Sequence, residues 1–210
     1  MKRIISIALV FAIVFAFAAC KANTNKETTA NSGTASQAQT TENNGKQDTT
    51  SSSSKTLVIY FSATGTTKGV AQRIASATGG DLYEITPAEP YSDADLNWHD
   101  NSSRTTKEQN DKSARPAIAN DTVKLDGYDT IYIGYPIWWG EEPRIMDTFV
   151  EAHSFEGKTV IPFCTSGGSG IGSSGKNLAQ LSKSGTWLNG ERLDVGISDS
   201  DLQGFINENK

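Results

Sequence analysis

The sequence predicts an α/β domain in which a parallel β-sheet is covered by helices on both faces. Two observations support this fold class. From residue 55 onward, short apolar runs rich in strand-forming residues alternate with segments whose apolar residues recur at helical spacing. The composition of the 210-residue chain, with 36% hydrophobic and 20% charged residues, is that of one ordinary globular domain with tails. Strands that alternate with helices imply parallel pairing, with crossovers on both faces of the sheet.

Residues 1–19 have the pattern of an export signal. Lys2 and Arg3 make a basic start, residues 4–17 are almost wholly apolar, and small residues follow. The apolar stretch is shorter than the roughly 20 residues of a membrane-spanning helix. The Phe-Ala-Ala-Cys sequence that ends at Cys20 resembles the bacterial lipoprotein signal, which implies lipid on Cys20 and a protein anchored to the outer side of a bacterial membrane. Ordinary secretion with an incidental cysteine is the alternative.

Residues 20–54 are predicted to be the lipidated cysteine and a disordered tether. From residue 21 to residue 54 the chain contains no aromatic residue and no Val, Ile, Leu or Met. Such a segment buries too little apolar surface to offset the entropy that is lost on ordering. The folded domain is therefore expected to span residues 55–210.

Five apolar runs predict the strands of the sheet. The first, Leu-Val-Ile-Tyr-Phe at 57–61, is continuous, as expected for a strand buried on both faces. It leads into a helix, because Val70 and Ile74 share a helical face before Gly79 ends the pattern. The other predicted strands are 81–85, 130–134, 159–163 and a weaker fifth at 193–196.

Apolar residues at helical spacing predict three further helices in the second half of the chain. These helices lie around residues 145–152, 178–181 and 202–206. Ser200 or Asp201 is the expected N-cap of the last one. The polar segment 90–126 is interpreted as a crossover with an insertion, and its composition is compatible with a helix from Ser103 to Lys112.

Three predicted loops lie at the carboxyl edge of the strands, where an open parallel sheet binds its ligands. The first reads Ser-Ala-Thr-Gly-Thr-Thr and lies between a strand and a helix. Backbone N–H groups, the positive end of the helix and side-chain hydroxyls converge there on an anion. The candidate residues are Ser62, Thr64, Gly65, Thr66 and Thr67. The same residues would also serve as a helix cap without a ligand.

The second loop places two tryptophans directly after a buried strand. Residues 135–140 read Tyr-Pro-Ile-Trp-Trp-Gly, and the chain must turn at Gly140. Because the strand has ended, Trp138 and Trp139 cannot both point into the core. At least one is expected to face the ligand crevice, where an indole stacks on a flat ring system. Packing of both indoles under the following helix is the alternative.

The third loop is rich in glycine. Residues 165–172 read Thr-Ser-Gly-Gly-Ser-Gly-Ile-Gly. Glycine lets the backbone approach a ligand closely and leaves N–H and C=O groups free to bond its edge. A loop that holds no ligand is the alternative.

Together, the three loops resemble those of the flavodoxin family. Residues 61–67, Phe-Ser-Ala-Thr-Gly-Thr-Thr, look like its phosphate loop. The Tyr-Pro-Ile-Trp-Trp stretch is similar to that of bacterial flavodoxin-like proteins. The resemblance covers most of residues 55–210. It implies a five-stranded sheet in the order 2-1-3-4-5 and one flavin mononucleotide (FMN) held without a covalent bond.

The resemblance also implies which residues contact each part of FMN. The first loop would hold the phosphate through the five residues named above. One side of the isoalloxazine ring would be bordered by Pro136, Ile137, Trp138, Trp139 and Gly140, and the other by Thr165, Ser166, Gly167, Gly168 and Gly170. Small flavodoxins often place an aromatic ring in the third loop, where this sequence has Ser and Gly. The second face of the ring would then be covered by backbone, by Tyr91 or Trp98 in the insertion, or by a partner protein.

The implied function is electron transfer with redox partner proteins outside the cytoplasm. The net charge is −5, and Glu141 and Glu142 follow the tryptophan loop. Negative charge and aromatic walls disfavour the anionic, fully reduced flavin, which predicts a low-potential carrier. One alternative is an FMN-dependent reductase that oxidises NADH or NADPH and reduces a quinone or a flavin, with Arg104, Lys107 and Arg115 binding an anionic substrate. Another is a redox-inactive binding module of the same fold.

The composition argues against two other classes of function. The chain has no run rich in Lys and Arg, which a nucleic-acid-binding surface would need. It has two cysteines, and its two histidines, His99 and His153, lie far apart in the sequence. Neither set has the spacing of metal ligands, so no metal is expected.

Overall fold

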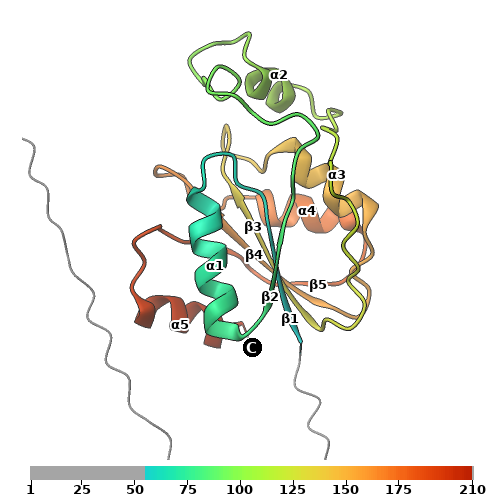
Figure 1. Cartoon of the computed structure of the whole chain (residues 1–210), viewed down its shortest axis with the longest axis vertical. Helices are drawn as coiled ribbons and strands as arrows, with labels where there is room; N and C mark the ends of the chain where they lie inside the picture. Colours follow the sequence, from blue (N-terminus) through green and yellow to red (C-terminus); the bar gives the residue numbers. More distant parts are fainter. Residues whose placement is uncertain (1–54, 210) are drawn as a thin grey trace, which may run out of the picture. The chain divides into compact units, whose positions relative to one another are not determined.

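The computed structural model describes residues 55–209, which form a parallel sheet between two layers of helices (Figure 1). The strands are β1 (Thr56–Tyr60), β2 (Asp81–Glu84), β3 (Thr130–Pro136) and β4 (Thr159–Thr165), followed by the short β5 (Thr186–Trp187) and β6 (Glu191–Arg192). The order is β2-β1-β3-β4-β5, with β6 also on β4. Every strand pair is parallel, which confirms the predicted fold class. The export signal, Cys20 and the tether lie outside the described residues.

The fifth strand differs from the prediction, which placed it at 193–196. Two short segments, β5 and β6, pair with the start and the end of β4 instead. Leu193 still donates a hydrogen bond from its N–H to the carbonyl of Cys164 (2.8 Å), but Asp194 then begins a turn closed by the N–H of Ile197 (3.0 Å). Between the segments, a Cβ at Gly190 would lie 2.4 Å from the carbonyl oxygen of Pro162, so only glycine allows this approach.

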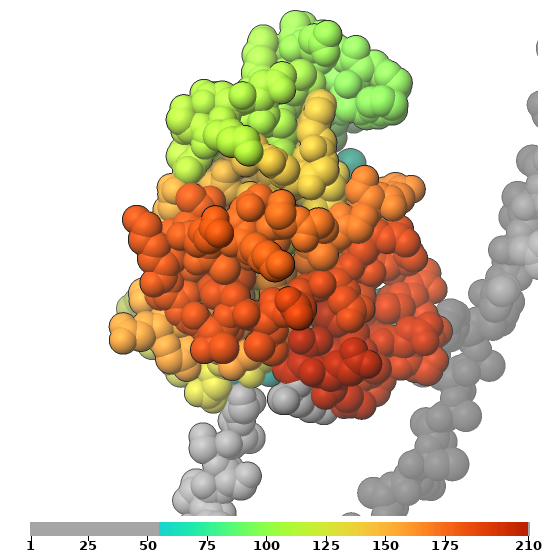
Figure 2. Space-filling view, turned by 180° about the vertical axis from the view of Figure 1, so that it is seen from behind, coloured from blue at the N-terminus to red at the C-terminus, as the bar shows by residue number. Residues whose placement is uncertain are grey.

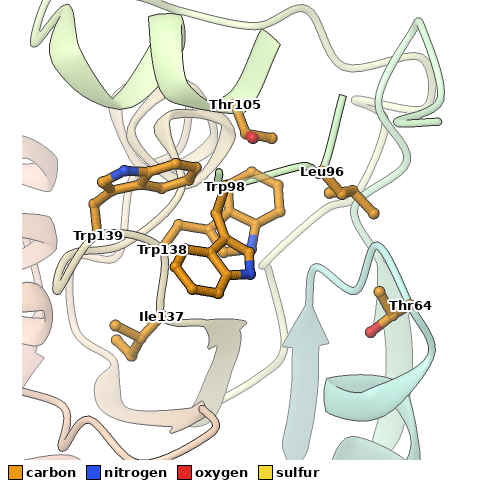
Figure 3. A pocket seen from close by; sticks show the side chains of 7 residues that line it. All are labelled: Thr64, Leu96, Trp98, Thr105, Ile137, Trp138 and Trp139. Carbon is orange, nitrogen blue, oxygen red and sulfur yellow. The ribbon is translucent and has the colours of Figure 1, made fainter. Parts of the chain in front are cut away.

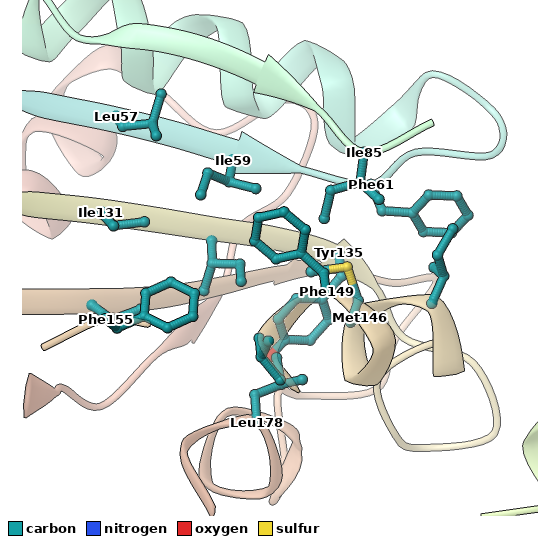
Figure 4. Packing of buried hydrophobic residues seen from close by; sticks show 14 of the residues in the cluster. Leu57, Ile59, Phe61, Ile85, Ile131, Tyr135, Met146, Phe149, Phe155 and Leu178 are labelled. Carbon is teal, nitrogen blue, oxygen red and sulfur yellow. The ribbon is translucent and has the colours of Figure 1, made fainter. Parts of the chain in front are cut away.

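Helices cover both faces of the sheet. On one face lie α1 (Thr66–Thr78) and α5 (Asp199–Glu208), and on the other α3 (Arg144–Ala152) and α4 (Ser174–Ser182) (Figure 1). Alternate residues of the central strands point to the two faces, so that Ile59 and Ile133 face α3 while Val58 and Tyr132 face α1. Figure 4 shows the core on the α3 face, where aromatic and aliphatic side chains interlock. This double burial explains the continuous apolar runs in the sequence.

The last helix begins at a different residue from the one expected. Ser198, and not Ser200 or Asp201, is the N-cap of α5, and its hydroxyl oxygen accepts a hydrogen bond from the N–H of Asp201 (3.1 Å). Asp201 lies in the first turn of α5, where its carboxylate accepts a bond from the Ser198 hydroxyl (2.7 Å). An acidic side chain there also complements the positive end of the helix.

The insertion between β2 and β3 forms a roof over the carboxyl edge of the sheet. It contains the short helix α2 (Arg104–Asn110), which lies beyond the ends of the strands in Figure 1. Seen from behind in Figure 2, the green residues of this segment form a lobe at one end of the molecule. Asn120 closes the base of the insertion, because its amide donates to the carbonyl of Glu84 (2.7 Å) and its Oδ1 accepts from the N–H of Thr86 (2.9 Å). Within residues 55–209, no helix has the length and apolarity needed to cross a bilayer.

Candidate functional site

A pocket of about 320 Å³ lies at the carboxyl edge of the sheet, beneath the roof (Figure 3). The first loop contributes Thr64 to its wall, and the second contributes Ile137, Trp138 and Trp139. The remaining lining residues, Leu96, Trp98 and Thr105, come from the insertion. The structure thus brings two of the three predicted loops together around one cavity. The third predicted loop does not line this cavity, and the insertion lines it instead, through Trp98 and through two residues that the sequence does not indicate.

The first loop has the features of an anion-binding turn. Gly65 stands at the N-cap position of α1 in the left-handed conformation (φ 84°), and no side chain caps the helix. The N–H groups of the first turn are therefore without side-chain partners and point toward the loop. Thr64 and Thr66 are exposed, with hydroxyls 3.1 Å apart. The alternative interpretation, a helix cap without a ligand, gains no support, because no side chain of the loop caps α1.

Ser62 adds a second observation that points to a ligand. Its hydroxyl is buried, and in the described structure this oxygen has no hydrogen-bond partner. A buried hydroxyl without a partner costs free energy, so such groups are rare unless a ligand or water bonds them. Ser62 lies two residues before Thr64, where the exposed part of the loop begins. The unsatisfied hydroxyl of Ser62 and the uncapped start of α1 at Thr66 therefore lie four residues apart in the sequence.

Thr67 of the first loop and Thr165 of the third, which the sequence predicts to contact the ligand, lie side by side in the structure. Both are buried, and their hydroxyl oxygens lie 2.8 Å apart in a hydrogen bond. This bond joins the start of α1 to the end of β4. The two side chains fix the spacing of the loops, while the backbone N–H of Thr67 belongs to the first turn of α1.

The second loop is a tight hairpin. The N–H of Trp138 donates to the carbonyl of Glu141, and the N–H of Glu141 donates to the carbonyl of Trp138, each at 3.0 Å. The two residues of the turn, Trp139 and Gly140, have φ values of 51° and 84°. This combination defines a type I′ turn, in which glycine or asparagine is favoured at both positions. A tryptophan there is strained, and strain of this kind is retained mostly where a side chain has a function.

The two tryptophans have different environments. Trp138 is half-buried and packs edge-to-face against Phe61 and Tyr91, with ring centroids 5.6 Å and 5.2 Å away. Trp139 is 44% exposed at the tip of the hairpin. Both rings line the pocket, which agrees with the expectation that at least one would face the crevice. Tyr91 supports Trp138 from behind and is absent from the pocket lining.

The glycine-rich loop lies beside the hairpin but does not line the pocket. Gly167, Gly168 and Gly170 are exposed, with open space where a Cβ would be. The Ser166 hydroxyl bonds the carbonyl of Ser169 and accepts a hydrogen bond from the N–H of Gly168 (3.2 Å), so the loop closes on itself.

Gln109 of α2 fixes the hairpin to the roof. Its buried side-chain amide donates to the carbonyls of Trp138 (3.0 Å) and Glu142 (3.1 Å), one on each side of the turn. Its own backbone carbonyl accepts a hydrogen bond from the guanidinium of Arg144 (3.2 Å). The sequence gives no signal for this contact, because Gln109 lies in a polar helix and its partners are far away along the chain.

Buried charges support the hairpin from the side of α3. The Arg144 guanidinium is paired with Glu141 (2.6 Å) and Asp147 (3.3 Å). Burial raises the pKa of Glu142 to about 7, and burial raises that of Asp147 to about 6 although Arg144 opposes this shift. Lys112 also bonds Glu141 (3.2 Å). Because Glu141 is paired twice and Glu142 titrates near neutrality, these carboxylates add less negative charge near the pocket than the sequence suggests.

Comparisons with known proteins give one family and several similar structures. The sequence profile of the family described as Flavodoxin matches residues 55–209. Two solved structures assigned as flavoproteins have a TM-score of 0.70. The one from Bacteroides eggerthii DSM 20697 is 46% identical over 74% of this chain and 98% of its own. The one from Bacteroides uniformis ATCC 8492 is 48% identical over 73% and 98%.

A more distant structure supports the fold. A flavoprotein in complex with FMN from Lactobacillus acidophilus NCFM has a TM-score of 0.57 and is 24% identical over 73% of this chain and 99% of its own. No curated protein matches the chain.

Proposed function

This chain belongs to the flavodoxin family and is an FMN-binding flavoprotein, and from this premise we propose that it is a low-potential electron carrier. The observation that carries the proposal is the lining of the pocket. All seven lining residues are aromatic, aliphatic or threonine, and none of them is ionisable. Such a lining suits a flat, uncharged ring system. It offers no side chain for proton transfer to a second substrate.

The residues of the site fit FMN at both ends of the molecule. The unpartnered Ser62 hydroxyl, the exposed hydroxyls of Thr64 and Thr66 and the uncapped start of α1 would bond the phosphate. Ile137, Trp138 and Trp139 would contact the isoalloxazine ring. When bound, FMN supplies the electron chemistry, and the protein provides binding, orientation and exclusion of water.

A low potential is favoured by the apolar walls of the pocket and by the net charge of −5. Both disfavour the anionic, fully reduced form of the flavin. The support from Glu141 is small, because Arg144 and Lys112 neutralise it.

The surroundings of the pocket favour the carrier over the reductase alternative. Arg104 is bonded to Glu108 and lies over the ring of Tyr91, and Arg115 is bonded to Glu151. These two side chains are paired with carboxylates of the protein, and neither they nor the exposed Lys107 line the pocket. No observation on the described residues favours an anionic substrate beside the flavin.

Titration with FMN followed by stepwise reduction tests the proposal. We expect the flavin absorption bands to shift on binding. The midpoint potential of the couple between semiquinone and fully reduced flavin should lie below that of free FMN. Neither NADH nor NADPH should be oxidised continuously. Sustained turnover with either nicotinamide would establish the reductase instead. Absence of FMN binding would leave the redox-inactive module.

We also propose that the protein works outside the cytoplasm, held by lipid on Cys20, with partner proteins that deliver and remove electrons. The support is the sequence of residues 1–20, since these residues lie outside the described structure. Mass spectrometry of the mature N-terminus tests it. A Cys20→Ser variant should lose the lipid mass and leave the membrane fraction. An unmodified cysteine in the wild-type protein would contradict lipidation.

A further inference from the structure

Trp98 is the most exposed large hydrophobic side chain of the described residues, yet it lies at the pocket. It is 66% exposed, on the segment of the insertion that precedes α2. Its ring packs on the ring of the neighbouring His99, with centroids 3.4 Å apart. Figure 3 shows Trp98 at the cavity together with Trp138 and Trp139, with Thr64 toward the side of the phosphate loop. An indole left in water beside a cavity gains free energy when a ligand buries it.

The segment that carries Trp98 is held in place by hydrogen bonds. The N–H of Leu96 donates to the carbonyl of Ser92 (3.1 Å). On the far side of Trp98, the carbonyl of Asp100 accepts from the hydroxyl of Thr106 (3.0 Å). Asp95 is bonded in the same way by Thr105 (2.5 Å). Both threonines belong to α2, so this helix fixes the segment on both sides of Trp98.

The same helix holds the tryptophan hairpin. Gln109 lies in α2 and donates to the carbonyls of Trp138 and Glu142. Trp98 and the hairpin tryptophans are therefore attached to one short helix, although about 40 residues separate them in the sequence. Attachment to a common support lowers the entropy that is lost when a ligand orders the site.

We propose that Trp98 closes the pocket over the isoalloxazine ring and supplies, on the second face of the ring, the aromatic contact that the glycine-rich loop lacks. This inference rests on the binding of FMN in the pocket. Residues 165–170 contain no aromatic side chain and do not line the cavity. Trp98 does line the cavity and reaches it from the insertion between β2 and β3. It acts as a positioning residue for the flavin.

Affinity measurements on the full-length protein test this role. Trp98→Ala should raise the FMN dissociation constant about tenfold, because one stacked aromatic contact is lost. Trp98→Phe should recover most of that affinity. The matched control is Trp187→Phe, which alters a tryptophan paired with the start of β4, at the opposite edge of the sheet. Its FMN affinity should stay within about twofold of wild type.

A second measurement separates closure of the pocket from a general effect on folding. Iodide should quench the emission of bound flavin more strongly in Trp98→Ala than in wild type, because the ring becomes open to solvent. The unfolding temperature without FMN should be unchanged, since the indole is exposed.

The proposal is overturned if Trp98→Ala binds FMN as tightly as wild type, with the same access of iodide. It is also overturned if Trp98→Phe loses as much affinity as Trp98→Ala, since the contact is then not aromatic. Wild-type protein that fails to bind FMN would overturn the proposed function as well. That outcome is read from the wild-type titration alone, so the two failures are distinguishable.

Discussion

At the scale of single residues, the buried hydroxyl of Ser62 supports the proposed phosphate site. Its hydroxyl oxygen has no partner in the described structure, although it is out of contact with water. A group of this kind destabilises the protein without its ligand and contributes to binding when the ligand arrives. The position of Ser62 in the first loop connects it with the phosphate and not with the ring.

Ser62→Ala should therefore weaken the binding of the phosphate of FMN and leave the binding of its ring unchanged. We expect FMN affinity to fall about tenfold, because one hydrogen bond to a charged group is lost. Affinity for riboflavin, which lacks the phosphate, should stay the same. The stability of the protein without ligand should be equal or higher. Parallel titrations with the two flavins give the result, and an equal loss for both would disprove a phosphate contact.

Trp139 provides a second test at the scale of one residue. Its φ of 51° is unfavourable for tryptophan, whereas glycine adopts this conformation without strain. Trp139→Gly should leave the free energy of unfolding unchanged or raise it by up to about 1 kcal/mol. The same variant should bind FMN more weakly, because a pocket wall is lost. Chemical denaturation and FMN titration measure the two effects. A large loss of stability would show that the indole itself holds the hairpin.

At the scale of elements, α2 and the hairpin form one unit through Gln109 and the charges around Arg144. Glu142 lies at the centre of this unit and is 1% exposed. The amide of Asn177 donates to its carboxylate (3.2 Å), and burial keeps its pKa near 7. A carboxyl whose pKa is raised on folding binds its proton more tightly in the native state. The native state therefore loses stability from this group as the pH rises from about 4.5 to above 7.

Glu142→Gln should remove this dependence on pH. A neutral amide keeps an oxygen for Asn177 and avoids a buried charge. We expect the variant to be more stable than wild type at pH 8 by roughly 1–3 kcal/mol, and to differ little at pH 5. Denaturation curves at the two pH values measure the difference. Glu156→Gln, at an exposed position, is the control. A constant difference across the range would assign the effect to packing.

The three central strands were predicted correctly because their sequence pattern reflects burial. Strands β1, β3 and β4 are buried on both faces, so their apolar runs are continuous. The fifth strand was misplaced because its position depends on the approach of Gly190 to Pro162, which no local pattern records. Val195 looked like a strand residue but is 57% exposed.

The same reasoning explains what was missed in the site. The loops after β1 and β3 were found because the carboxyl edge of a parallel sheet is a general location for ligands. Leu96 and Thr105 were missed because they lie in a polar segment whose path over the pocket depends on distant hydrogen bonds. One of these joins Gln109 to Trp138.

At the scale of the whole molecule, FMN should stabilise the entire domain. The pocket is lined by residues of the first loop, the insertion and the hairpin, which are far apart in the sequence. Because only folding brings them together, the unfolded chain has no FMN site. At a free FMN concentration 100 times the dissociation constant, the free energy of unfolding should rise by about 2.7 kcal/mol. Thermal scans at increasing FMN concentration measure this effect. An unfolding temperature that does not change with the FMN concentration would show that FMN does not bind the folded state in preference to the unfolded chain.

The hydrogen bond between Thr67 and Thr165 has a consequence for how the protein matures. It joins residues 98 positions apart, at the start of α1 and at the end of β4, and β3 lies between β1 and β4 in the sheet. This bond can form only when residue 165 has been synthesised and β4 has joined the sheet. A polypeptide exported in an unfolded state would cross the membrane without its flavin. It would have to acquire FMN from the medium on the far side, after folding.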